Sequence, residues 1–377
     1  MLAERLPPDG VPVLDLSIGE PQHAPPALLA ETVAAQAGTW NRYPPPGGTP
    51  AFRSAVAAWL QRRYALPEGM LDADRHVLPL AGTKEGLFLL PSVLPAKPDA
   101  AILLPNPLYA VYLGGAVLAG ARPVPLATTA ATGFLPDLDA LDERLLEHTT
   151  AFFLCTPANP QGAVASQAYL ERLLRLARRH DFLLIVDECY AEIWDEAPPA
   201  GGLQAAAATG GGLDHLVVLH SLSKRSNAAG LRSGFIAGDS DLLARFGRLR
   251  AYGAAVQPLP LMAAATRLWQ DEVHVEANRA AYRAKLDLAE RRLGNRFGFY
   301  RPAGGFFLWL DVGDGVAAAR RLWSEAALKV LPGSFLTMGS VQPGLEDDPG
   351  ARYIRLALVH DETTIDGAFD RLIEVLG

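Results

Sequence analysis

The sequence of 377 residues has only two cysteines, Cys155 and Cys189. Two cysteines cannot build a disulfide framework or a cysteine-rich zinc site. Both lie in apolar segments, AFFLC (151–155) and IVDEC (185–189), where a free cysteine behaves as a small hydrophobic side chain. The sequence therefore predicts free cysteines and no bound metal.

The sequence also lacks a basic excess and long apolar runs. Its 34 Lys and Arg are outnumbered by 41 Asp and Glu, which gives a net charge of −7, so no basic surface is predicted for nucleic acid or an anionic membrane. No run of 18 apolar residues occurs, and MLAERLPPDG (1–10) lacks a basic region followed by an apolar one. We therefore expect a cytoplasmic protein that binds small metabolites, with no nucleic-acid or membrane partner.

Short apolar runs alternate with helical patterns through the middle of the chain. Six runs of strand length begin near residues 77, 101, 151, 182, 216 and 234. Between the third and the fourth, the segment 167–180 places Leu170, Leu173, Leu174 and Ala177 on one helical face. This βαβ pattern predicts an α/β fold with a mostly parallel sheet covered by helices on both faces. Ligands of such sheets bind beyond the carboxyl ends of the strands.

The last hundred residues have a different pattern. A long charged helix is expected near 271–296 and another helix near 316–328, together with the apolar segments GGFFLWLDV and YIRLALV. We expect a large domain (41–270), a small C-terminal α+β domain (271–377) and an N-terminal segment (1–40) that joins the small domain. The Ala- and Gly-rich segment 202–212 is expected to form a loop over the sheet.

Lys224 lies between two predicted strands, in the segment HSLSKRSNAAGLRSG (220–234). Lysines are mostly exposed to solvent, so a functional role needs support from the other strand ends. Gly82 and Thr83 follow the strand near 77 and begin a helical pattern, whose free backbone N–H groups would cradle an anion such as phosphate. The nucleotide-binding pattern GxxxxGK[ST] is absent.

Polar side chains also follow the neighbouring predicted strands. Asn159 stands in an Asn-Pro turn after the strand near 151. Asp187 ends a strand that should be buried, and Tyr190 follows three residues later. Because an unpaired buried carboxylate costs several kcal/mol, Asp187 is expected to have a cationic partner.

Pyridoxal 5'-phosphate (PLP) would use all of these groups. Its pyridinium nitrogen would pair with Asp187, its phenolic oxygen would contact Asn159 and Tyr190, and its aldehyde requires an amine, which Lys224 supplies. Besides the helix N-terminus, its phosphate would be bound by Ser221, Ser223 and Arg232.

These residues, in this order, resemble the class I, fold-type I PLP-dependent aminotransferases over nearly the whole chain. The resemblance adds five positions. Gly19 in SIGEP would lie near the substrate carboxylate, and Tyr43 would reach the cofactor phosphate from a neighbouring subunit. Lys84 would belong to the phosphate-binding turn, Tyr109 would stack on the pyridine ring, and Arg355 would bind the substrate α-carboxylate.

The resemblance also implies a fold and a division of roles. The fold would be of type I, with a mostly parallel seven-stranded sheet flanked by helices in the large domain and a smaller α+β domain. The protein would be a homodimer whose active site is shared across the interface. The catalytic residues would be Lys224, Asp187 and Tyr190. The substrate-binding residues would be Gly19, Asn159 and Arg355.

The segments IGEPQHAPP (18–26) and SLSKRSN (221–227) most resemble the bacterial N-succinyl-L,L-diaminopimelate aminotransferases of lysine biosynthesis. This resemblance implies transfer of an amino group from glutamate to N-succinyl-2-amino-6-oxopimelate. Aspartate, aromatic or L,L-diaminopimelate specificity stays open, as does a PLP-dependent C–S lyase. Arg225 is either a ligand for a distal substrate carboxylate or a surface residue. Ala110 departs from the proline that the family usually has after the stacking aromatic.

Overall fold

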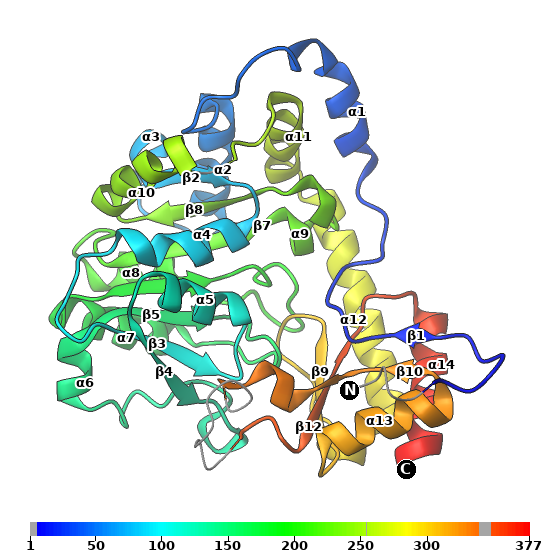
Figure 1. The fold of residues 1–377 in the computed structure, drawn as a ribbon. Coiled ribbons are helices and arrows are strands. Elements are labelled where there is room, and N and C mark those ends of the chain that lie inside the picture. The colour runs from blue at the N-terminus through cyan, green and yellow to red at the C-terminus, as the bar shows by residue number, and fades with distance from the viewer. Residues whose placement is uncertain (1–5, 254, 339–347) are drawn as a thin grey trace.

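The computed structural model describes residues 6–253, 255–338 and 348–377, which form helices packed around a seven-stranded and a three-stranded sheet (Figure 1). The helices are α1 (Ala27–Ala35), α2 (Pro50–Arg63), α3 (Ala73–His76), α4 (Thr83–Leu89), α5 (Ala110–Leu118), α6 (Glu143–His148), α7 (Gln167–Arg179), α8 (Gly202–Thr209), α9 (Leu222–Arg225), α10 (Ser240–Gly253), α11 (Leu259–Gln270), α12 (Val273–Leu293), α13 (Gly315–Ala326) and α14 (Glu362–Leu376). The strands are β1 (Leu14–Asp15), β2 (Val77–Leu80), β3 (Ala101–Asn106), β4 (Arg122–Ala127), β5 (Thr149–Cys155), β6 (Leu183–Asp187), β7 (Leu216–Ser221), β8 (Gly234–Gly238), β9 (Phe307–Asp311), β10 (Leu328–Lys329), β11 (Leu331–Pro332) and β12 (Tyr353–Ala357).

The seven-stranded sheet has the order β2-β8-β7-β6-β5-β3-β4, and only β8 runs antiparallel to its neighbours. Successive side chains of a strand point to opposite faces. Accordingly, Phe152 and Leu154 pack in one core with α2, α7 and α8, whereas Ala151 and Phe153 pack in a second core with α4, α5 and α10. The predicted mostly parallel sheet with helices on both faces is confirmed.

All six strands predicted from apolar runs lie in this sheet, and the seventh, β4, was missed. Its sequence RPVPLA contains Pro123 and Pro125, which lack the backbone N–H that a central strand needs. The structure places β4 at the sheet edge, paired only with β3. Prolines are tolerated there, because one side of an edge strand has no partner strand.

The expected loop at 202–212 is wrong for most of its length. Residues 202–209 form α8, which buries Leu203, Ala205 and Ala206 in the core shared with β7. Four consecutive alanines favour a helix, and burial of one face against the sheet provides the stabilisation that a short helix lacks on its own. Gly210, with a φ of +68°, ends the helix.

The C-terminal part of the chain forms the three-stranded antiparallel sheet β11-β12-β9. This sheet packs with α12, α13 and α14 in a third core. The N-terminal strand β1 pairs in parallel with β10, so segments from both ends of the chain lie side by side (Figure 1). The helices expected near 271–296 and 316–328 are α12 and α13.

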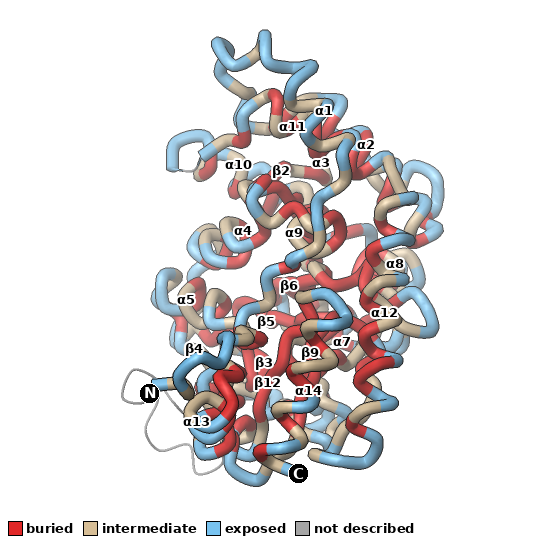
Figure 2. The backbone as a smooth tube through the Cα atoms, turned by 90° about the vertical axis from the view of Figure 1, so that its right-hand side faces the viewer, coloured by how far each residue is buried: buried red, intermediate tan, exposed pale blue. Residues whose placement is uncertain are grey.

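Buried residues concentrate in the strands, whereas much of the segment between β1 and α1 lies at the surface (Figure 2). Along the described ranges, no helix combines the length and the hydrophobicity needed to cross a membrane.

Candidate active site

The candidate site lies at the carboxyl edge of the seven-stranded sheet. Asp187 ends β6 and Ser221 ends β7, while Asn159 follows β5. Lys224 lies in α9, the short helix directly after β7. Parallel strands bring these chain-distant side chains to one edge of the sheet, as the sequence predicts.

Lys224 is half-buried, and its amine faces the N-terminal segment. Its Nζ donates a hydrogen bond to the carbonyl oxygen of Gly19 and lies 5.5 Å from the ring centroid of Phe306. Burial lowers the pKa of the Lys224 amine to about 8, because removal from water disfavours the ammonium form. A neutral amine is the form that attacks a carbonyl, so this environment suits a nucleophilic lysine.

Asp187 is buried, with 4% exposure. Its Oδ2 accepts a 2.6 Å hydrogen bond from the hydroxyl of Tyr112, and its Oδ1 accepts one from the backbone N–H of Cys189 at 3.2 Å. Burial raises the pKa of the Asp187 carboxyl, and among the described residues no basic side chain forms an ion pair with it. The geometry therefore fits a cationic ligand group, such as a protonated ring nitrogen.

The hydrogen bond from Tyr112 to Asp187 was not predicted from the sequence. Tyr112 lies three residues after Tyr109, in the first turn of α5, and its ring stacks on Phe153 of β5. The only available signal was this spacing, because residues three apart in a helix lie on similar faces. Which carboxylate a buried tyrosine reaches depends on how the helix packs on the sheet.

The residues predicted to bind phosphate lie on two neighbouring segments, the turn before α4 and the segment 221–232 after β7. Gly82 precedes α4 with a φ of +82°, and a Cβ at this position would lie 2.4 Å from Nη2 of Arg232. Glycine is therefore required both by the backbone conformation and by the close guanidinium. The hydroxyl of Ser221 donates to that of Ser223 at 2.9 Å and accepts from its backbone N–H at 3.1 Å. Thr83 is buried at the start of α4.

Arg232 is exposed, and within the described ranges its guanidinium donates hydrogen bonds only to backbone carbonyl oxygens. Its φ is +52°, and Nη1 donates to the carbonyl oxygen of Ala229 at 2.8 Å. No carboxylate among the described residues pairs with it. A guanidinium without an internal anion is suited to bind one from a ligand. Lys84 is also exposed, on the first turn of α4.

Arg355 links the two sheets. It lies in β12, is 7% exposed, and donates to Oδ1 of Asn159 at 2.9 Å and to the carbonyl oxygen of Ser17 at 2.7 Å. Its guanidinium lies 4.3 Å from the ring centroid of Phe307, and its buried Nε has no hydrogen-bond partner. Burial lowers the pKa of Arg355 to about 10. The guanidinium therefore retains an unused donor for a carboxylate ligand.

Aromatic rings line the space between these polar groups. Tyr190 is 8% exposed and meets the rings of Phe306 and Phe307 edge-on, at centroid distances of 5.5 and 5.7 Å. Tyr109 is half-buried, and burial raises the pKa of its hydroxyl to about 12. Its φ of −82° and ψ of 117° are the extended values that a residue before proline would adopt. Ala110 in place of proline therefore leaves this backbone conformation unchanged.

Tyr43 lies away from the other predicted site residues. It is fully exposed and contacts none of them.

Arg225 is neither a substrate ligand nor a surface residue, because it is 2% exposed and its Nη2 lies 2.8 Å from Oε1 of Glu272. Its guanidinium packs against the rings of both Trp59 and Trp269, which contact each other. Both alternatives proposed for Arg225 are therefore wrong.

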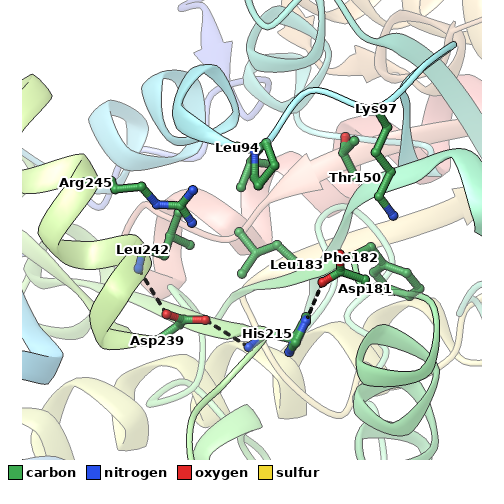
Figure 3. Close-up of a pocket in the computed structure, with 11 residues that line it drawn as sticks. Leu94, Lys97, Thr150, Asp181, Phe182, Leu183, His215, Asp239, Leu242 and Arg245 are labelled. Carbon is green, nitrogen blue, oxygen red and sulfur yellow. Dashed lines mark hydrogen bonds and ion pairs between the residues drawn. The ribbon is translucent and has the colours of Figure 1, made fainter.

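A separate cavity of about 110 Å³ lies at the opposite edge of the sheet (Figure 3). It is lined by residues at the amino ends of the parallel strands, including Thr150, Leu183 and His215. Asp181 accepts from His215 Nε2, and Asp239 accepts from the His215 backbone N–H, so its carboxylates are already satisfied. Ligand sites for drug-sized molecules enclose about 300–1,000 Å³, so this cavity is too small for a PLP-sized group.

Comparison with known proteins defines the family. A model of the family described as aminotransferase class I and II matches residues 11–372, so the chain belongs to this family. The chain is 34% identical to the 4-dedimethylamino-4-oxo-anhydrotetracycline transaminase OxyQ of Streptomyces rimosus, over 97% of this chain and 94% of that one. It is 33% identical to the LL-diaminopimelate aminotransferase of Desulforudis audaxviator, over 98% and 91% of the two chains.

Solved structures confirm the fold. The crystal structure of an aminotransferase from Neisseria meningitidis superposes with a TM-score of 0.93 at 36% identity, covering 100% of this chain and 95% of that one. A Thermus thermophilus protein named as a probable N-succinyldiaminopimelate aminotransferase superposes with a TM-score of 0.87 at 28% identity, covering 97% and 96%. The protein therefore has the predicted fold-type I architecture.

As a member of this family, the protein is a PLP-dependent aminotransferase. The described residues fit this cofactor on independent grounds. The amine of Lys224 has a lowered pKa, the carboxylate of Asp187 lacks a cation, and the close approach of Arg232 to Gly82 leaves no room for a side chain there. Each of these features matches a different group of PLP.

Proposed function

We propose that the protein transfers an amino group between glutamate and N-succinyl-2-amino-6-oxopimelate, and so takes part in lysine and diaminopimelate biosynthesis. The segments 18–26 and 221–227 support this substrate, as does the likeness to the Thermus thermophilus structure. Because these substrates are intermediates of central biosynthesis, we propose a cytoplasmic location.

The observation that carries the catalytic part of the proposal is the environment of Lys224. Its amine, with a pKa lowered to about 8, lies beside Gly19 at the sheet edge that also holds Asp187. We assign to Lys224 both the attachment of PLP and the transfer of the substrate α-proton, because a lysine of pKa near neutrality can serve as a general base.

Bound PLP supplies an electron sink for the negative charge that develops at the substrate α-carbon. In this proposal Asp187 holds the ring nitrogen in its protonated form, and Tyr112 holds Asp187 in place. Tyr190 and Asn159 bind the phenolic oxygen. The phosphate is bound by Gly82, Thr83, Lys84, Ser221, Ser223 and Arg232, and Tyr109 stacks on the ring.

Arg355 binds the substrate α-carboxylate in this proposal. Its two terminal nitrogens now donate to Asn159 and to the Ser17 carbonyl oxygen, and a substrate carboxylate would offer a bidentate, charge-assisted alternative. Gly19 permits a close approach, because a Cβ there would lie 2.6 Å from Cζ of Phe307.

We also propose a homodimer, in which Tyr43 binds the phosphate in the neighbouring subunit. Tyr43 is 100% exposed and Tyr252 is 95% exposed, which is unusual for tyrosine side chains unless a partner covers them. The large domain (41–270) would form this interface. The small domain (271–377), with the segment 1–40, would contribute Arg355 and Gly19 to substrate binding.

The test compares two amino donors that differ only at the distal end. N-Succinyl-L,L-diaminopimelate and unmodified L,L-diaminopimelate are each assayed with 2-oxoglutarate, and glutamate formation is measured. We expect kcat/KM to be at least tenfold higher with the succinylated donor. Equal or reversed preference would contradict the proposed specificity.

Unmodified L,L-diaminopimelate is the second candidate, since the relative from Desulforudis audaxviator carries that name. A lyase is separated by a different readout, because it releases ammonia without any 2-oxo acid acceptor. Lys224→Ala is expected to abolish turnover with every donor, together with the absorbance of the cofactor attached covalently to this lysine. Appreciable activity in this variant would contradict the role given to Lys224.

A further inference from the structure

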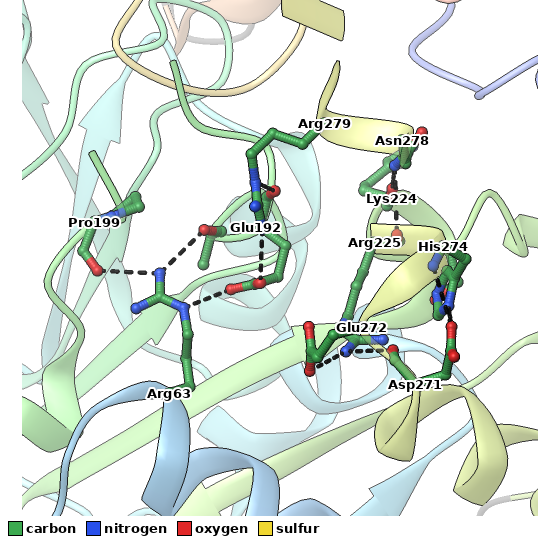
Figure 4. Close-up of polar contacts among 12 residues, drawn as sticks. Arg63, Glu192, Pro199, Lys224, Arg225, Asp271, Glu272, His274, Asn278 and Arg279 are labelled. Atoms are coloured by element: carbon green, nitrogen blue, oxygen red, sulfur yellow. Dashed lines mark hydrogen bonds and ion pairs between the residues drawn. The ribbon is translucent and has the colours of Figure 1, made fainter. Parts of the chain in front are cut away.

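Hydrogen bonds join the turn that carries Lys224 to the beginning of α12 and to the residues just before it; Figure 4 shows those of Lys224 and Arg225. Nδ2 of Asn278 donates to the carbonyl oxygens of Lys224 and Arg225, at 3.1 and 3.3 Å. Asn278 is buried, with 7% exposure, in the second turn of α12. The two peptide groups that follow the Cα of Lys224 are therefore held by a side chain from a different helix.

The next residue along the chain, Ser226, is fastened to the same helix. Its Oγ lies 2.8 Å from Nε2 of His274, and Nδ1 of His274 contacts Oδ2 of Asp271. The order of these groups is that of a hydrolase triad, but Ser226 has 0% exposure. No substrate can reach the hydroxyl, so the three groups hold the backbone rather than act as a nucleophilic site.

Arg225 completes the attachment. Its Nη1 donates to the carbonyl oxygen of Leu268 at 2.6 Å, and Nη2 contacts both the carbonyl oxygen of Asp271 and the carboxylate of Glu272. These acceptors lie at the junction between α11 and α12. Residues 224–226 thus make all of these bonds to the single segment 268–278, which we call the α12 clamp.

The same helix also reaches the amine end of Lys224. Tyr282 lies four residues after Asn278, and its ring stacks on Phe306 with centroids 5.0 Å apart. Phe306 in turn lies 5.5 Å from Nζ of Lys224. At its other end α12 packs against α14 (Figure 1). One helix therefore connects both the backbone and the amine of Lys224 to the C-terminal part of the chain.

We propose that Asn278, supported by the Ser226–His274 contact, is a positioning residue that sets where the Lys224 amine lies in the active site. The proposal rests on the proposed role of Lys224 as the PLP lysine. Asn278 touches neither the amine nor the reacting atoms; it acts through the Lys224 backbone. Loss of the clamp allows the turn to move, and the amine then becomes better hydrated.

The test measures Lys224 itself in the protein without cofactor. Competitive acetylation across a range of pH, read by peptide mass spectrometry, gives the pKa of each lysine. In Asn278→Ala we expect the pKa of Lys224 to rise by about one unit from about 8, because hydration favours the ammonium form. We expect kcat to fall about tenfold with little change in KM for glutamate, since Arg355 is untouched.

Three comparisons make the result specific. Glu276→Ala removes an exposed side chain from the same part of α12 and should leave the pKa of Lys224 unchanged. Ser226→Ala, which removes one hydroxyl only, should shift it in the same direction but by less. Lys97, whose amine donates to Thr149 and His180 carbonyl oxygens far from the clamp, serves as an internal reference.

An unchanged pKa of Lys224 in a folded Asn278→Ala protein would overturn the proposal, whatever happens to its thermal stability. Failure of the proposed function is recognised separately. Wild-type protein is incubated with PLP and reduced with borohydride, and the labelled lysine is identified. Label on a lysine other than Lys224 would reject the role of Lys224, whereas label on Lys224 with unaltered pKa in the variants would reject only the clamp.

Discussion

The hydroxyl of Tyr112 donates a 2.6 Å hydrogen bond to Oδ2 of Asp187, across 75 residues of sequence. Tyr112 is 1% exposed and Asp187 is 4% exposed, so water could not easily replace the tyrosine hydroxyl as a donor to Asp187 if that hydroxyl were removed. A hydrogen bond to a charged group contributes about 1.5–3 kcal/mol. Tyr112 therefore stabilises the ionised form of Asp187, which is the form that a ring nitrogen cation needs.

Tyr112→Phe is expected to lower kcat about tenfold to a hundredfold, which corresponds to that hydrogen-bond energy. Removal of the donor raises the pKa of Asp187 further, so the acid limb of the pH–rate profile should move to higher pH. Steady-state kinetics with glutamate measure both effects. Tyr169→Phe, which removes the 2.8 Å hydrogen bond from the Tyr169 hydroxyl to the Pro136 carbonyl oxygen, is the matched control. Identical kinetics in the two variants would contradict the role given to Tyr112 in supporting Asp187.

The lowered pKa of Lys224 predicts how the apoprotein takes up PLP. Only the neutral amine attacks the aldehyde, and burial places its pKa at about 8 instead of 10.5. The rate of attachment should therefore rise with pH through about 8 and then level off. The growth of the cofactor absorbance band after mixing measures it. A rate that continues to rise beyond pH 10 would indicate an ordinary, hydrated lysine.

Arg355→Lys is expected to raise KM for glutamate about tenfold or more, with a smaller effect on kcat. An ammonium group cannot make the bidentate contact that a guanidinium makes with a carboxylate. Arg352→Lys is the control, because Arg352 lies three residues earlier and forms only an exposed ion pair with Asp311. If both variants raise KM equally, Arg355 does not bind the substrate carboxylate.

Complementation tests whether Tyr43 acts across subunits. Tyr43→Ala and Lys224→Ala proteins, each inactive at limiting PLP, are unfolded together and refolded. Random pairing makes half of the dimers mixed, and each mixed dimer then has one site with both residues intact. About a quarter of wild-type activity should return. No recovery would place Tyr43 in the same subunit as its Lys224, and sedimentation as a fully active monomer would reject the dimer.

The sequence by itself determined the kind of fold and the chemical groups of the site. Strand and helix periodicities are local, so the pattern from 77 to 238 was enough to predict the α/β arrangement, except at β4, whose prolines conceal an edge strand. Functional groups at strand ends are also readable, because parallel strands bring their carboxyl ends together. Lys224 and Asp187 were identified in this way.

Only the tertiary structure decided which groups touch. Arg355 meets Asn159 across 196 residues, and Asn278 meets the Lys224 carbonyl oxygen across 54. The sequence could not distinguish a free Arg225 from one buried against two tryptophans. Such contacts depend on how whole elements pack, and a hydrogen bond forms only when packing brings two atoms to about 3 Å. Residue types are encoded locally, whereas these distances are set by the assembled helices and sheets.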